Sequence, residues 1–272
     1  MKLVAIDLDG TLLHDDCTIS QYTKNIIEEA SRNDIMVVPT SGRSFRNIKE
    51  QVKDIEGIKY CICSNGSIVC RLDTEEVLYD HKIPVETAYE IYKEIKRRGG
   101  FVQIYSDTNT FVENDVRHII YDSKLPDEFC DNLLATDIPI LSSELLLKRG
   151  LMQVNKLHVV FSDPSEMPDF ADYCKTIEGI ICTYPSNYNM EIFATGCNKD
   201  KGIRIICEKC GIEQQDTIAI GDSDNDVAMI QYANIGIAVD NAMDVLKDAA
   251  DYITKSNNED GPAIVLEKIL KK

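Results

Sequence analysis

Short apolar runs alternate along this chain with segments whose apolar residues recur at helical spacing. Residues 2–6, 35–38 and 60–63 are apolar without polar alternation, which is typical of strands buried in a parallel sheet. Amphipathic segments that begin near Ser20 and Ser44 separate these runs. Because parallel strands need a crossover connection, this order predicts an α/β fold with a doubly wound, Rossmann-like parallel sheet and helices on its faces.

The alternation breaks in the middle of the chain and then returns. Residues 68–80 indicate a hairpin, residues 106–156 resist assignment, and strand–helix alternation resumes at residue 199. We therefore expect residues 1–81 and 189–272 to form the core, interrupted by an inserted α/β domain over residues 82–188.

Composition excludes several classes of protein. The chain has 272 residues, 44% of them hydrophobic, and 46 acidic against 29 basic side chains give a net charge of −17. Such a charge repels nucleic-acid and lipid phosphates, so we expect neither a nucleic-acid nor a membrane partner. The longest apolar run near the start, residues 3–6, is far shorter than the roughly 20 residues of a spanning helix, so we expect neither a targeting nor a membrane segment. We expect a cytoplasmic protein whose ten cysteines stay reduced and fill apolar positions.

Carboxylates follow two of the predicted strands directly. The run DLDGTL at residues 7–12 places Asp7 and Asp9 after the first strand, and GDSDND at residues 221–226 follows residues 217–220. Ligands of a doubly wound sheet bind beyond the carboxyl ends of its strands, so both motifs are placed at one site.

Two further motifs add groups that suit an anion. TSGR at residues 40–43 offers hydroxyls and backbone donors before a helix, and Lys199 enters a later helix. Clustered carboxylates repel one another, and a hard divalent cation such as Mg²⁺ relieves that repulsion. A carboxylate beside a phosphate and Mg²⁺ can act as a nucleophile, and a second one can transfer protons. The set therefore predicts phosphoryl transfer through an aspartyl-phosphate.

Four ordered motifs, each beside a suitable element, resemble those of the haloacid dehalogenase superfamily, and within it the Cof-type (class IIB) phosphatases that carry an α/β cap. The resemblance covers the whole predicted core and implies that the insert is the cap that controls substrate choice and water access. It implies Asp7 as nucleophile and metal ligand, and Asp9 as general acid/base with its backbone carbonyl on Mg²⁺. Asp222 would ligate the metal directly, and Asp226 would support it.

The resemblance also assigns the phosphate-binding residues, which would be Leu8, Ser41, Gly42, Lys199 and Asn225. Two positions depart from the family pattern. Ser41 stands where the family usually has threonine, which preserves the hydroxyl. Asp200 stands where glycine often follows the lysine, which leaves Lys201 as a rival, although the spacing to residues 210–212 favours Lys199.

Other motifs have plainer interpretations. Arg43 is more often a structural ion-pair former than a catalyst, and Asn65-Gly66 is first of all a turn, with a substrate-side role as the alternative. We predict an Mg²⁺-dependent phosphatase for a small phosphomonoester such as a sugar phosphate or cofactor-pathway phosphate, working as a monomer or weak homo-oligomer. A phosphomutase or phosphotransferase, and a non-enzymatic phospho-receiver, are the alternatives.

Overall fold

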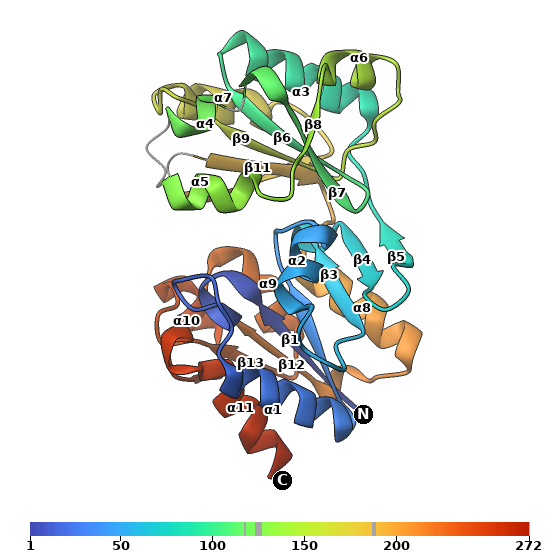
Figure 1. The fold of residues 1–272 in the computed structure, drawn as a ribbon, viewed down its shortest axis with the longest axis vertical. Coiled ribbons are helices and arrows are strands. Elements are labelled where there is room, and N and C mark those ends of the chain that lie inside the picture. The colour runs from blue at the N-terminus through green and yellow to red at the C-terminus, as the bar shows by residue number, and fades with distance from the viewer. Residues whose placement is uncertain (117, 123–126, 187–188, 272) are drawn as a thin grey trace. The chain divides into compact units, whose positions relative to one another are not determined.

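The computed structural model describes the chain apart from residues 117, 123–126, 187–188 and 272. It divides into two compact units (Figure 1). The core unit comprises Met1–Tyr79 and Asn198–Lys272, and the inserted unit comprises Asp80–Cys197.

Parallel strands dominate the sheet of the core unit. Its strands are β1 (Lys2–Asp7), β2 (Ile35–Thr40), β3 (Tyr60–Cys63), β4 (Ile68–Arg71), β5 (Val77–Asp80), β12 (Thr217–Gly221), β13 (Ile235–Ala238) and β14 (Tyr252–Ile253). The described residues give the order β14-β13-β12-β1-β2-β3-β4-β5. Neighbours from β14 to β3 are parallel, and β4 runs antiparallel to β3. The predicted parallel-sheet core is therefore confirmed.

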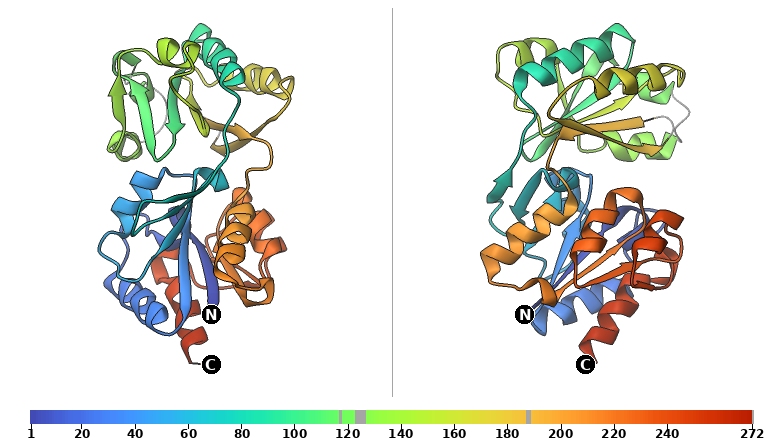
Figure 2. Two further views of the ribbon diagram at one scale, coloured as in Figure 1. Left: turned by 90° about the vertical axis from the view of Figure 1, so that its right-hand side faces the viewer. Right: turned by 180° about the vertical axis from the view of Figure 1, so that it is seen from behind.

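Helices cover both faces of this sheet. They are α1 (Gln21–Arg32), α2 (Phe45–Val52), α8 (Lys199–Cys210), α9 (Val227–Tyr232), α10 (Asp244–Ala249) and α11 (Gly261–Leu270). In Figure 2, α1 and α8 lie on opposite faces. The Ser20 side chain caps the amino end of α1 by accepting a hydrogen bond from the Thr23 N–H. Gly211, in the left-handed conformation with φ 65°, caps the carboxyl end of α8.

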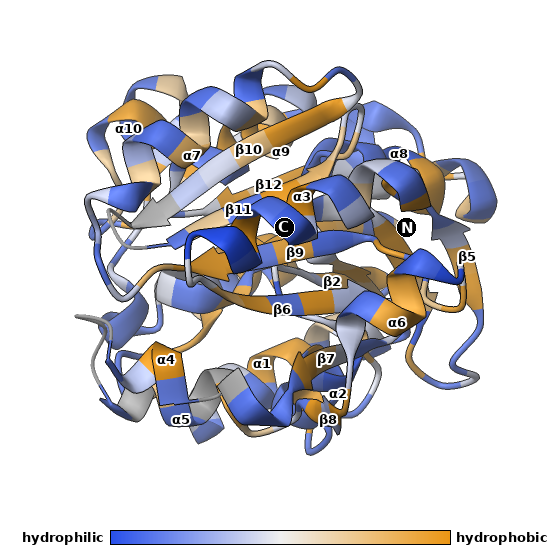
Figure 3. Cartoon of the chain, turned by 90° about the horizontal axis from the view of Figure 1, so that it is seen from above, coloured by the Kyte–Doolittle hydropathy of each residue, from blue (hydrophilic) through white to orange (hydrophobic). Residues whose placement is uncertain are grey.

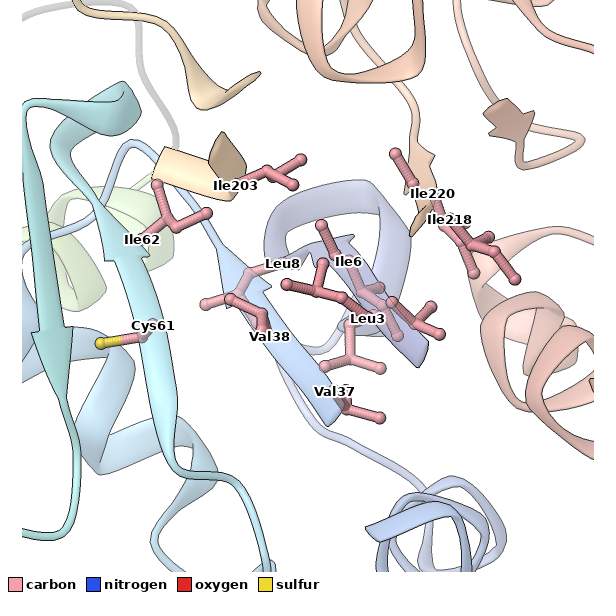
Figure 4. Packing of buried hydrophobic residues seen from close by; sticks show 14 of the residues in the cluster. Leu3, Ile6, Leu8, Val37, Val38, Cys61, Ile62, Ile203, Ile218 and Ile220 are labelled. Atoms are coloured by element: carbon pink, nitrogen blue, oxygen red, sulfur yellow. The ribbon is translucent and has the colours of Figure 1, made fainter. Parts of the chain in front are cut away.

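The core of this unit lies between the sheet and its helices. Residues of β1, β2, β3 and β12 meet there, together with Ile203 of α8 (Figure 4). Close approach of α8 depends on Gly202, where a Cβ would lie 2.6 Å from Ile62 Cγ2. The amino end of α8, which begins at Lys199, is thereby held against the sheet.

The inserted unit has its own sheet and core. Its strands are β6 (Phe101–Ser106), β7 (Asn109–Glu113), β8 (Ile138–Ile140), β9 (Lys156–Val160), β10 (Ile180–Ser186) and β11 (Asn189–Ala194), in the order β10-β11-β9-β6-β7-β8. Its helices are α3 (Val85–Arg97), α4 (His118–Tyr121), α5 (Asp127–Leu134), α6 (Ser143–Lys148) and α7 (Glu166–Lys175). Apolar residues concentrate along strands such as β6, whereas the helices mix apolar and hydrophilic positions (Figure 3).

One strand belongs to a different sheet from the one expected. Residues 189–194 were expected in the core, but β11 pairs with β9 and β10 of the inserted unit. Its side chains are buried there, and Met190 and Ile192 join the hydrophobic core of the inserted unit. Local apolar pattern predicts a strand but does not say which sheet it joins, because pairing is a long-range contact.

The stretch 106–156 contains several short elements, among them α4 with four residues and β8 with three. Such elements are too short to show a period. Among the described helices, none combines the length and apolar character needed to cross a membrane.

Candidate active site

The motif residues follow neighbouring parallel strands of the core unit. β1 ends at Asp7, β2 ends at Thr40 directly before Ser41, and β12 ends at Gly221 directly before Asp222. β1 pairs in parallel with both β2 and β12, so these residues leave the sheet at one edge. The sheet topology alone brings together three segments that are far apart in sequence.

The turn after β1 brings its backbone close to Asp222. Gly10 has φ 75°, and a Cβ at this position would lie 2.7 Å from Asp222 Oδ2. The neighbouring Thr11 hydroxyl donates a hydrogen bond of 2.9 Å to Asp222 Oδ1. Glycine is thus required both for the left-handed backbone and for the space it leaves.

Lys199 is the positive centre of the site. Its side chain is 1% exposed, and Nζ lies 2.6 Å from Asp7 Oδ1 and 2.5 Å from Asp226 Oδ1. Nζ also donates a 3.3 Å hydrogen bond to Asn225 Oδ1. Lys201, the rival considered from the sequence, is exposed, and its Nζ lies 5.9 Å from the centre of the Tyr79 ring. Only Lys199 of the two contacts the carboxylates described here.

Asp226 is fixed from both sides. Its Oδ2 accepts hydrogen bonds from the backbone N–H groups of Asp222, at 3.0 Å, and Ser223, at 3.1 Å. Its Oδ1 faces Lys199, and the residue is fully buried. Asp226 therefore orients both the lysine and the loop that carries Asp222.

Burial and crowding raise the pKa of two carboxyl groups. Burial moves the pKa of Asp7 well above its usual range; Lys199 opposes this shift, and the charges of Asp226 and Asp222 reinforce it. Burial, together with the Asp226 charge, raises the pKa of Asp222 to about 6. Burial disfavours the charge on Lys199, but Asp226 and Asp7 outweigh that effect and raise the lysine pKa.

The residues present fit a hard divalent cation. Carboxylate oxygens of Asp7, Asp222 and Asp226 lie within 4.8 Å of one another. Lys199 supplies one positive charge against these three acidic groups, so a negative charge remains to be neutralised. An all-oxygen donor set of this kind favours hard divalent cations over softer metals.

The Asp9 side chain lies apart from this cluster. Its carboxylate accepts hydrogen bonds from Arg43, with Nη2 2.6 Å from Oδ1 and Nε 2.9 Å from Oδ2. The Asp9 side chain is 55% exposed, whereas that of Asp7 is 6% exposed. The structure thus brings Asp7, Asp222 and Asp226 together and directs the Asp9 carboxylate to Arg43.

The remaining predicted residues surround this centre. Leu8 is buried beside Asp7, and Ser41 is buried with its hydroxyl accepting the Arg43 N–H at 3.1 Å. Gly42 lies between Ser41 and Arg43 in the same turn. The Asn65 side chain accepts a 3.3 Å hydrogen bond from Asn225 Nδ2, which links the Asn65-Gly66 turn to the site.

Sequence reasoning missed the hydrogen bond from the Thr11 hydroxyl to Asp222, and it predicted Arg43 as an ion-pair former without identifying Asp9 as the partner. Thr11 lies inside the motif DLDGTL and Arg43 inside TSGR. Their partners are 211 and 34 residues away, respectively, so local sequence carried no signal for either contact.

Comparison with known proteins shows similarity over nearly the whole chain. The family model of haloacid dehalogenase-like hydrolases matches residues 4–266. The Bacillus subtilis 5-amino-6-(5-phospho-D-ribitylamino)uracil phosphatase YcsE is 28% identical over 263 residues, covering 97% of this chain and 93% of its own. The crystal structure of a haloacid dehalogenase-like hydrolase from Bacteroides thetaiotaomicron is similar with a TM-score of 0.85 and 25% identity, covering 98% of this chain and 99% of its own.

A structure described as a sugar phosphatase of HAD subclass IIB shares the fold, with a TM-score of 0.80 at 24% identity over 99% of both chains. The family match extends over both segments of the core unit and the inserted unit between them. The chain therefore belongs to the haloacid dehalogenase-like hydrolases and is an enzyme of their phosphatase class.

Proposed function

We propose that this enzyme is a Mg²⁺-dependent phosphatase that hydrolyses a small-molecule phosphomonoester through an aspartyl-phosphate on Asp7. The observation that carries the proposal is the buried cluster of Asp7, Asp222 and Asp226 around Lys199. A buried lysine held by two carboxylates provides fixed positive charge where a phosphoryl group would otherwise meet only negative charge.

In the first step, an oxygen of Asp7 attacks the phosphorus and the ester P–O bond breaks. Asp9 gives its proton to the departing oxygen, and the phosphoryl group is then bound to Asp7 as a mixed anhydride. Lys199 stabilises charge on the phosphoryl oxygens and on Asp7. Asp7 is suited to this role because it stands at the end of a strand, with little freedom to move.

In the second step, Asp9 accepts a proton from a water molecule whose oxygen attacks the same phosphorus. The bond to Asp7 breaks, and inorganic phosphate leaves. Mg²⁺ held by the side chains of Asp7, Asp222 and Asp226 and by the Asp9 carbonyl would neutralise charge that develops on the phosphoryl oxygens.

We assign phosphate binding to Leu8, Ser41, Gly42, Lys199 and Asn225, and substrate choice to the inserted unit. A sugar phosphate or a cofactor-pathway phosphate is the substrate class we favour, since YcsE is named for a ribityl phosphate. We place the enzyme in the cytoplasm, as a monomer or weak homo-oligomer. All ten cysteines are free thiols, which suits a reducing compartment.

The test is phosphate release from a panel of sugar, nucleotide and cofactor phosphates, including 5-amino-6-(5-phospho-D-ribitylamino)uracil, with Mg²⁺ or with chelator. We expect Mg²⁺-dependent release from at least one member. An isomerised sugar phosphate without free phosphate would indicate a mutase instead. Inertness toward every ester, p-nitrophenyl phosphate included, would contradict the proposal.

Metal binding has a test that does not require turnover. Mg²⁺ at a concentration about 100 times its Kd should stabilise the protein by about 2.7 kcal/mol and raise its melting temperature. The Asp222→Asn variant removes one of the clustered carboxylates, so Mg²⁺ should raise its melting temperature by less than that of the wild type. Equal shifts in both proteins would place the metal elsewhere.

A further inference from the structure

Arg43 pairs with Asp9 beside the site, and the proposed steps assign Arg43 no role. Arg43 uses two nitrogens on both oxygens of Asp9: Nε lies 3.2 Å from Oδ1 and 2.9 Å from Oδ2, and Nη2 lies 2.6 Å from Oδ1. Bidentate pairs of this kind restrict the carboxylate in angle as well as in distance.

The backbone beneath Arg43 is itself fixed. Its N–H donates to the Ser41 hydroxyl at 3.1 Å, and its carbonyl accepts the Ser64 N–H at 2.9 Å. The Asn65 N–H in turn donates to the Ser41 carbonyl at 3.1 Å. The guanidinium therefore extends from a turn that also carries Ser41, one of the proposed phosphate-binding residues.

A contribution to folding stability does not account for the Arg43–Asp9 pair. The Asp9 side chain is 55% exposed and that of Arg43 is 20% exposed, and exposed ion pairs contribute little to folding. Asp9 also stands inside the kinked segment Leu8–Leu12, where its own φ and ψ are −76° and 120°, outside the helical range. Its side chain thus depends on a partner from outside the segment for a defined direction.

We propose that Arg43 is a positioning residue for Asp9, which holds the carboxylate outside the Asp7, Asp222 and Asp226 cluster and in reach of the leaving group. The inference rests on the proposed function, since it takes Asp9 as the group that transfers protons. Asp9 leaves the guanidinium with a proton taken from solvent and gives that proton to the leaving-group oxygen in the first step. It regains a proton from the attacking water in the second step and returns it to solvent when it pairs with Arg43 again. Arg43 acts through Asp9 and makes no bond to the reacting atoms.

The decisive experiment is a double-mutant cycle on kcat with an alkyl phosphate. We expect Arg43→Ala to lower kcat by about 10- to 100-fold with little change in KM, since a misplaced proton donor slows chemistry more than binding. In the Asp9→Asn background, the same substitution should cause no further loss. Arg43→Lys should restore only part of the activity, because an ammonium cannot make the bidentate contact.

Arg46→Ala is the matched control, since this exposed arginine lies three residues further along the chain and its loss changes the charge equally. With p-nitrophenyl phosphate, whose leaving group needs no proton, Arg43→Ala should keep the initial burst and slow only the subsequent steady state. An equal loss of kcat in both backgrounds would mean that Arg43 acts on the substrate directly. Activity equal to that of Arg46→Ala would mean that it has no positioning role; either result overturns the proposal.

A spectroscopic readout separates failure of this inference from failure of the proposed function. The NMR signal of the Arg43 Nε–H, identified by its absence from Arg43→Ala, should exchange slowly with water in the wild type and quickly in Asp9→Asn. This comparison needs no turnover. Fast exchange in the wild type would overturn this inference even if the enzyme proved to be an active phosphatase. Slow exchange in a protein inactive on every ester would contradict the proposed function and would leave the Arg43–Asp9 pairing without the catalytic role we give it.

Discussion

At the scale of single residues, Lys199 holds the acidic centre together. It is buried, and two of the three clustered carboxylates contact it directly. Removing one partner of a buried ion pair leaves an uncompensated buried charge, which costs far more than the pair itself contributes. Variants within this site are therefore best compared with matched variants of residues that lie outside it.

Lys199→Met should destabilise the metal-free protein by about 3–5 kcal/mol, because Asp7 and Asp226 then stay buried without their cation. Urea unfolding in the presence of chelator measures the effect. Lys201→Met removes the same charge from an exposed position and should change the free energy of unfolding by less than about 1 kcal/mol. Similar losses in the two variants would contradict the central role of Lys199.

Asp7→Asn should lower kcat by about 10³-fold or more, since an amide cannot form the aspartyl-phosphate. Lys199 keeps the Asp226 carboxylate as its partner, and burial already disfavours the charged form of Asp7, so the neutral variant should stay folded and melt near the wild-type temperature. Phosphate release and thermal melting are measured on the same preparation. Activity above a few per cent of the wild type would exclude Asp7 as the nucleophile.

At the scale of elements, the position of α8 decides where Lys199 lies. The helix begins at this residue, and Gly202 in its first turn packs against Ile62 of β3. Helix-to-sheet contact therefore has a direct chemical consequence, because a shift of the first turn moves Nζ away from Asp7.

Gly202→Ala should destabilise the protein by about 1–3 kcal/mol and lower kcat, because the added methyl group would lie 2.6 Å from Ile62 Cγ2. Denaturant unfolding and steady-state kinetics measure the two effects. Adding Ile62→Ala should recover part of both losses by making room for the methyl group. If the double variant is worse by the full sum of the single effects, the close contact is not the cause.

At the scale of the whole molecule, the core unit and the inserted unit each bury hydrophobic clusters of their own. The core of the inserted unit includes Leu157 and Val159, while the adjacent residue His158 is buried as part of a polar network. His158 Nδ1 lies 2.8 Å from Gln103 Oε1, and its Nε2 lies 3.2 Å from Asn189 Nδ2. One ring nitrogen faces an acceptor and the other a donor, as suits a neutral imidazole.

Burial lowers the pKa of His158 from 6.5 to about 4, with Glu191 opposing the shift and Lys156 adding to it. Between these values the unfolded chain binds a proton that the folded protein does not, so stability rises with pH across this window and is lost as pH falls. The loss on going from about pH 7 to about pH 4 should be about 3 kcal/mol.

Urea unfolding of the wild type and of His158→Gln at both pH values measures this contribution. The glutamine variant retains every other titrating group, so it should lose about 3 kcal/mol less than the wild type over the same interval. Equal losses in the two proteins would show that His158 is not held neutral by the fold.

Much of this protein follows from local patterns in its sequence. Apolar runs without alternation predict strands such as β1 and β12, and residues 199–210 have helical spacing that matches α8. The carboxyl ends of parallel strands lie at the same edge of the sheet, so the motifs that follow these strands are brought together there. Carboxylates of Asp7, Asp222 and Asp226 do lie close to one another.

Tertiary structure decided the contacts that join distant segments. The local apolar pattern of residues 189–194 fits a strand in either sheet, and only the pairing with β9 and β10 assigns them to the inserted unit. The Arg43 contact with Asp9, and that of Thr11 with Asp222, depend on loops whose side-chain directions follow from packing. Periodicity records which face of an element is buried, whereas the partner across a turn or a sheet is chosen by the folded chain, and that choice directs Asp9 to Arg43 and away from the acidic cluster.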